Sequence, residues 1–137
     1  MNLLCSIEDD QLGTKLRGLL DHGWYVFRSA TPGRRLLSPG DRLCFYQRRV
    51  GVVAQATAAS AATLRHVPGN PDPQRYPYAF EVRGVRYFFK KPVVLDSDLR
   101  AQLDAYKGRD PLQPWAWFVQ GTHIISDHDF KVLTGRA

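Results

Sequence analysis

The 137-residue chain has no long hydrophobic run, and its first acidic residues follow within ten positions of the start. A membrane-spanning helix needs about 20 predominantly apolar residues in a row, and a signal peptide needs an apolar segment behind a basic start. Neither pattern is present. We therefore expect a protein that does not enter a membrane and that resides in the cytoplasm.

Cysteine and metal-binding patterns are equally scarce. Cys5 and Cys44 are the only cysteines, and each lies in an apolar stretch far from any C-x-x-C spacing, which favours buried, reduced thiols. The four histidines show neither H-x-x-x-H nor H-E-x-x-H spacing, and no G-x-G-x-x-G or Walker loop occurs. We predict a protein without a metal or a cofactor.

A catalytic group is also hard to assign. The segment from Ser126 to Phe130 holds a serine, a histidine and two aspartates, but neighbours on one helical turn point in different directions. Ser126 followed three residues later by Asp129 fits a helix-capping arrangement instead. The sequence therefore favours a protein that is not an enzyme.

Arginine is what the sequence has in excess. The formal net charge is +6, and the window from Arg28 to Arg49 holds six arginines against one acid, Asp41. Arginine offers a planar fork for phosphate and a flat face for stacking, besides its charge. A polyanion such as nucleic acid is the first partner to consider.

Aromatic residues form the second unusual feature. Trp24, Tyr25 and Phe27 lead into Arg28, in a segment that also carries glycine, serine, threonine and proline. Such rings either fill a small core or stack on a base, and for Trp24 and Trp115, which flank loops, we favour binding. A ring that holds a base beside cations that hold its phosphate suits an extruded or single-stranded nucleotide.

Hydrophobic periodicity and turn signals predict a mixed fold. The expected strands span 2–7, 42–47, 50–59, 78–85, 87–95 and 115–121, where residues 81–89 could equally form one bent strand. The expected helices begin near 10, 96 and 126, and residues 60–74 are expected to be an irregular loop. No repeat or linker divides the chain. We predict a single α+β domain over 1–137, a barrel or half-barrel of about five to six strands with two or three small helices.

Several short motifs follow one another in a specific order along nearly the whole chain, from Leu3 to about Leu133. They are W-x-x-x-R-x-x-T-P-x-R-R from Trp24, "LSPGDRLCFYQ" from Leu37, "YPY", "KKPVVL" and "PWAWFVQGTHIISDHDF" from Pro114. Their order and spacing resemble an EVE domain, a member of the PUA-like superfamily and a relative of the YTH domain.

The resemblance implies a mixed β pseudo-barrel with an aromatic pocket beside a basic surface. Relatives recognise modified or flipped bases, such as methylated or hydroxymethylated cytosine in DNA, or modified adenine in RNA. The residues then expected at the base are Trp24, Tyr25, Thr31, Trp115, Trp117, Phe118, Gln120 and Ser126. Those expected at the phosphates are Arg28, Arg34, Arg35, Arg48 and Arg49. Relatives often carry small residues where this chain has Tyr25, Val26 and Phe27. The bulkier side chains of this chain should narrow the pocket.

The resulting hypothesis is a non-catalytic module, favoured as a monomer, that reads a base of DNA or RNA. Both nucleic acids fit, because only a contact to the 2′-hydroxyl separates them. One alternative is an enzyme acting on a nucleotide or a small amide, as in ASCH-type relatives, with Asp41, His123 and Asp127 as acid–base candidates. Another is a ligand-sensing or protein-interaction module whose basic patch meets an acidic partner.

Overall fold

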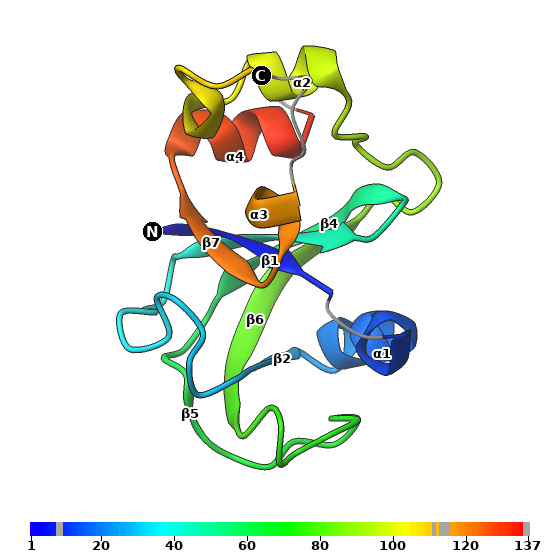
Figure 1. Cartoon of the computed structure of the whole chain (residues 1–137). Coiled ribbons are helices and arrows are strands. Elements are labelled where there is room, and N and C mark those ends of the chain that lie inside the picture. Colours follow the sequence, from blue (N-terminus) through cyan, green and yellow to red (C-terminus); the bar gives the residue numbers. More distant parts are fainter. Residues whose placement is uncertain (8–9, 111, 113–115, 136–137) are drawn as a thin grey trace.

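Seven strands form one curled sheet in the computed structural model, which describes residues 1–7, 10–110, 112 and 116–135 (Figure 1). The strands are β1 (Asn2–Ser6), β2 (Trp24–Phe27), β3 (Arg42–Gln47), β4 (Gly51–Ala58), β5 (Thr63–Leu64), β6 (Tyr78–Tyr87) and β7 (Thr122–Ile125). The helices are α1 (Asp10–Asp21), α2 (Ser97–Ala101), α3 (Ala116–Val119), α4 (Asp127–Leu133) and the 3-10 helix η1 (Asp104–Tyr106).

The sheet is mixed and has two distinct ends. Its strand order is β2-β6-β4-β3-β1-β7, with β5 added to β6. β1 and β3 run parallel, and the other neighbours run antiparallel. The sheet curls into a half-barrel, so that its end strands β2 and β7 lie on either side of an open seam (Figure 1). This seam determines where the candidate site lies.

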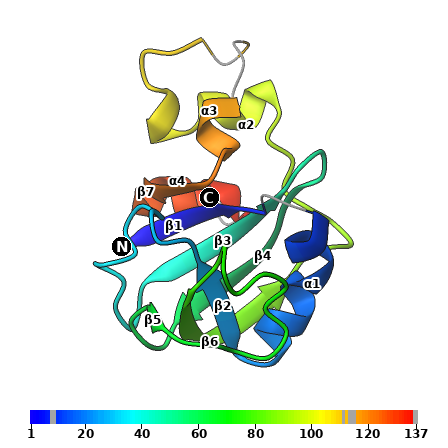
Figure 2. The ribbon, with the colours of Figure 1, turned by 60° about the horizontal axis from the view of Figure 1, so that its bottom comes forward.

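The central strands are apolar on both faces because the sheet separates two hydrophobic cores. Leu3 and Phe45 point into the half-barrel, whereas their neighbours Leu4 and Cys44 point toward the C-terminal helices. Alternate residues of a strand face opposite sides, so both sets are buried. Helices α2, α3 and α4 gather over one face of the sheet, and α1 lies beside β2 and β6 (Figure 2).

Both cysteines are free and buried, as predicted. Cys5 and Cys44 lie on the neighbouring strands β1 and β3, but their side chains belong to different cores. Burial raises the pKa of the Cys5 thiol to about 12 and that of Cys44 well above its usual value. Both thiols are therefore protonated and unreactive at neutral pH.

Much of the predicted fold is confirmed. The α+β class, the strand at 42–47, and the caps of the later helices agree with the structure. Asp96 accepts a hydrogen bond from Leu99 N at the start of α2, and Ser126 accepts one from Asp129 N at the start of α4. The first helix ends before Gly23, whose φ is +84°.

Three predicted elements are wrong in type or extent. The strand predicted over 115–121 is wrong for its described residues, 116–121. α3 covers Ala116–Val119, because a short apolar run fits either period and here packs Phe118 into the helix-side core. The alternative of one bent strand around residues 81–89 is confirmed, because β6 runs from Tyr78 through Gly84, whose φ is +61°, to Tyr87. The separate strand over 87–95 is wrong, and a turn precedes Pro92 instead. The predicted loop at 60–74 contains the short strand β5.

Within the described ranges, no helix combines the length and apolar character that a membrane crossing requires.

Candidate functional site

A cleft opens at the seam of the half-barrel, where the ends of β1 and β2 face the start of β7. Its inner part has a volume of about 210 Å³ and is lined by residues of β2, of the loop that follows it, and of the start of β7. Its outer part has a volume of about 400 Å³. The two parts share Ser6, Arg28 and Gly121, so they form one continuous cleft.

Backbone hydrogen bonds fix the floor of the cleft. Ser6 N donates to Gly121 O at 2.9 Å, and Ile7 N donates to Tyr46 O at 2.9 Å. These bonds hold the end of β1 between the segment before β7 and the end of β3. Because β1 and β3 are parallel, their carboxyl ends meet at the same edge of the sheet. The site is therefore built on rigid elements.

Aromatic rings form the walls of the inner cleft. Tyr25, Phe27 and Tyr76 line it, and each is only 3% exposed. Tyr25 packs edge-on against Phe27, with ring centroids 6.0 Å apart, and against Phe45, at 4.8 Å. Rings held by such contacts lose little freedom on binding a flat ligand, so the inner cleft is preorganised.

Arginines dominate the outer cleft. Arg28, Arg48 and Arg75 come from three separate segments and converge there, and they are the charged side chains among its described lining residues. The guanidinium carbons of Arg28 and Arg75 each lie 5.7 Å from the ring centroid of Tyr76. The arrangement places guanidinium groups next to aromatic side chains, which suits a ligand with an anionic and a flat part.

The open edge of β2 adds main-chain groups to the inner cleft. Val82 N donates to Gly23 O at 2.9 Å, which sets the phase of the antiparallel ladder between β2 and β6. Since hydrogen-bonded pairs alternate along such a ladder, Tyr25 and Phe27 bond to β6. The N–H and C=O of Val26, a lining residue, therefore point away from β6 toward the seam.

The structure brings part of the predicted site together. Five of the residues expected from the sequence line the cleft, namely Tyr25, Arg28, Thr31, Arg48 and Gln120. They come from β2, the loop after it, the β3–β4 turn and the segment before β7. These are the predicted residues on which a function of this cleft can depend.

The other predicted residues lie outside the lining. Trp24 is half-buried under the guanidinium of Arg65, whose carbon lies 4.1 Å from the indole centroid, and Phe118 is buried in the helix-side core. Trp24 and Tyr25 are neighbours on a strand, so their side chains face opposite sides. In the described part of the cleft, tyrosine and phenylalanine line the walls where tryptophans were expected. Trp115 lies outside the described residues.

Several predicted polar residues have structural contacts instead. Arg34 donates from Nε to Ser29 O at 2.8 Å and stacks over Tyr78. Ser126 caps α4 and donates to Asp104 Oδ2 at 2.7 Å. Arg35 and Arg49 are exposed and are not among the lining residues.

Among the lining residues that the sequence did not predict, several have aromatic or charged side chains, including Tyr46, Arg75 and Tyr76. Tyr46 lies on the predicted strand 42–47, Arg75 directly follows the predicted loop 60–74, and Tyr76 belongs to the YPY motif, to which no site role was assigned. The segment "QRYPY" combines arginine with tyrosine, as the segment from Tyr25 to Arg28 does. That shared composition was the available signal for a second part of the site.

The acid–base candidates are not in the cleft lining. Asp41 accepts hydrogen bonds from Ser38 N and from the amino group of Met1, each at 2.9 Å, and His123 Nε2 contacts the carbonyl of Trp117 at 2.7 Å. Asp127 accepts a hydrogen bond from Asn2, which, together with a neighbouring guanidinium, lowers the pKa of its carboxyl. All three residues contribute to the structure of the fold.

Asp104, His128 and Asp129 place their ligand atoms within 4.8 Å of one another. Each already has a structural partner. The carboxylate of Asp129 accepts hydrogen bonds from the backbone N–H groups of Asp104 and Ala105, at 2.6 and 3.0 Å, and His128 Nε2 contacts Gln102 O. These contacts dock η1 on α4 and account for the cluster without an ion.

Comparison with known proteins gives matches in structure alone. No protein-family model matches the chain, and no curated protein matches its sequence. A crystal structure of a protein from Pseudomonas putida has a TM-score of 0.62, 17% identity and 99% coverage of both chains. One from Pseudomonas syringae has a TM-score of 0.62, 16% identity and full coverage of both.

The YTH domain-containing protein Mmi1, solved as a complex with RNA, is also similar in structure. Its TM-score is 0.60 at 9% identity, covering 97% of this chain and 80% of that one. Such low identities show similarity of fold. The fold is thus the predicted mixed α+β half-barrel.

Proposed function

We propose that the protein is a non-catalytic nucleic-acid-binding module. One base of a DNA or RNA strand enters the inner cleft, and the arginines of the outer cleft hold the phosphates that flank it. Methylated or hydroxymethylated cytosine is the first candidate among modified bases, because the motif resemblance points to readers of such bases.

The observation that carries this proposal is that aromatic side chains and guanidinium groups line one cleft. Stacking of a base on an aromatic ring contributes about 1–3 kcal/mol, whatever the base. A contact between a guanidinium and a phosphate is charge-assisted and often bidentate. In the proposed complex, the base lies against the aromatic lining formed by Tyr25, Phe27 and Tyr76, and the phosphates meet Arg28, Arg48 and Arg75.

The edge of the base would meet main-chain and hydroxyl groups. Val26 directs an N–H and a C=O toward the seam, and Thr31 adds a hydroxyl that both donates and accepts. Fixed main-chain groups discriminate between donor and acceptor positions on a base. The similarity in fold to the Mmi1 domain, which was solved with RNA, supports a nucleic-acid partner.

The test is a binding screen by fluorescence anisotropy. DNA and RNA oligonucleotides, single-stranded and double-stranded, each carry one modified base or its unmodified counterpart, and each is titrated at several salt concentrations. We expect affinity to fall steeply with salt, by about 0.7–0.9 in the log–log slope for each phosphate contacted.

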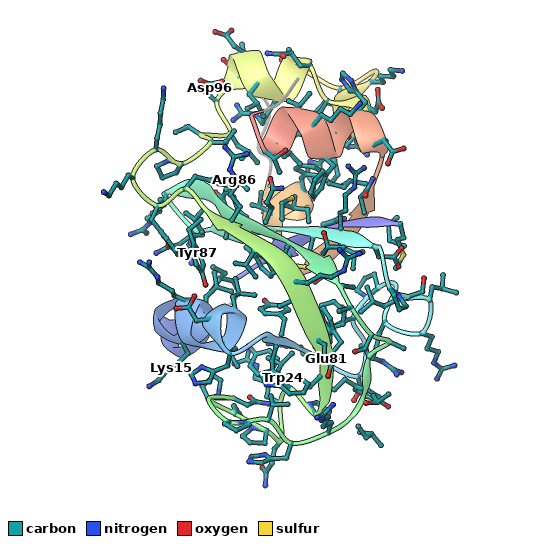
Figure 3. All side chains as sticks on the ribbon, turned by 180° about the vertical axis from the view of Figure 1, so that it is seen from behind. Lys15, Trp24, Glu81, Arg86, Tyr87 and Asp96 are labelled. Atoms are coloured by element: carbon teal, nitrogen blue, oxygen red, sulfur yellow. The ribbon has the colours of Figure 1, made fainter. Side chains whose placement is uncertain are left out.

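Variants separate the cleft from the general positive charge. Arg48→Gln and Arg75→Gln should each reduce the salt slope by nearly one unit, whereas Arg86→Gln should change it less. Arg86 is an exposed arginine of β6 outside the cleft lining, seen from behind in Figure 3. Equal effects of all three substitutions, or an affinity that does not depend on salt, would overturn the proposal.

A further inference from the structure

A half-exposed tryptophan lies beside the outer cleft. α3 leads directly into the cleft, which Val119 and Gln120 line, and Trp117 lies on the same short helix. The side chain of Trp117 is 37% exposed. Trp117 lies two residues before Val119 and three before Gln120, and both of these residues line the outer cleft.

The indole of Trp117 is held in place from several sides. Its centroid lies 5.4 Å from that of Tyr106 and 6.2 Å from that of His123, which meets it edge-on. The guanidinium carbon of Arg109 lies 4.4 Å from the indole centroid. Trp117 and Arg109 are both exposed, and indole and guanidinium groups are two that stack on nucleobases.

We propose that Trp117 and Arg109 form a second base-stacking position, outside the cleft, for a nucleotide that neighbours the one in the cleft. The inference rests on the proposed function. It gives the bound strand a path from the seam, past Arg48 and Gln120, to α3. Recognition then extends from a single base to its flanking base.

The chain contains a matched control for this inference. Trp24 is also a half-buried indole under a guanidinium, that of Arg65, at a similar 4.1 Å. Its side chain is not among those that line the cleft or belong to α3. A generic effect of losing an exposed indole–guanidinium pair should therefore appear equally in Trp24→Ala and Trp117→Ala.

The experiment measures the affinity of 9-nucleotide oligothymidine and oligouridine for the protein and for both variants, at several salt concentrations. Thermal unfolding confirms that each variant is folded. We expect Trp117→Ala to lower the affinity about 5- to 150-fold with the salt slope unchanged, because stacking releases no counterions. Trp24→Ala should retain the affinity of the unmodified protein. In a 9-mer carrying 5-iodouracil, photocrosslinks should map to Trp117.

Each other outcome is decisive. If the protein binds the 9-mers and Trp117→Ala binds them equally well, or if both variants lose affinity alike, the second position is refuted and the cleft proposal stands. If neither 9-mer binds even at 50 mM salt, this inference fails, and the modified-base screen decides the proposed function separately. If Trp117→Ala loses affinity and also shows a smaller salt slope, Trp117 positions a phosphate contact. That result would refute the second base-stacking position.

Discussion

The turn that joins β3 and β4 carries Arg48 and Arg49, and their replacement by glycine should have opposite effects on stability. Val50 N donates to Gln47 O at 3.0 Å, which closes a four-residue turn with the two arginines at its centre. Arg49 has φ of +65° and is the non-glycine residue with positive φ among the described positions. Arg48, one residue earlier, has an ordinary backbone conformation.

The magnitude follows from these two conformations. The left-handed region costs an L-residue about 1–2 kcal/mol, and glycine escapes this cost. Glycine also increases the entropy of the unfolded chain, which costs about 0.5–1 kcal/mol. Arg49→Gly should therefore raise the free energy of unfolding by about 0.5–1 kcal/mol, whereas Arg48→Gly should lower it by about 0.5–1 kcal/mol.

Reversible urea and thermal unfolding, followed by circular dichroism, measure both variants against the unsubstituted protein. A gain of this size corresponds to a rise in Tm of about 2–4 °C in a domain of this length. In the same preparations, Arg48→Gly should bind nucleic acid more weakly, because Arg48 lines the cleft. Equal destabilisation by both substitutions would refute the argument from backbone strain.

Three further predictions concern the framework around the site. Asp129→Ala should lower the free energy of unfolding by about 2–4 kcal/mol, because it leaves two amide groups at the start of η1 without their buried acceptor; urea unfolding checks this. The hydrogen bonds that lower the pKa of Asp127 stabilise the fold above the ordinary pKa of an aspartate and are lost as pH falls through the lowered value. Unfolding measured from pH 5 to pH 2 should therefore show less loss of stability in Asp127→Asn than in the unsubstituted protein. Gly51→Ala should destabilise the protein far more than Gly40→Ala, although both glycines have positive φ. At position 51 the new Cβ would overlap the carbonyl of Val93, whereas at position 40 it meets open space. Equal Tm values of the two variants would contradict this.

The amino-acid sequence determined the local elements whose signals lie within a few residues. The strand at 42–47 is predicted to its last residue, because an apolar run is bounded by "SPGD" on one side and by two arginines on the other. The cap of α4 is predicted because Ser126 and Asp129 act on neighbouring backbone groups. The buried thiols follow in the same way, from the apolar stretches around them.

Only the tertiary structure decided what the cleft contains. Tyr25, Arg48 and Arg75 are far apart in the sequence and meet because strand ends converge where the curled sheet does not close. A shift of one residue in the register of β2 would turn Trp24 instead of Tyr25 toward the cleft. The pairing of β2 with β6 sets that register. The helical form of α3 likewise depends on the core that receives Phe118. Local patterns carry none of this information, because it resides in contacts between segments that are remote in sequence.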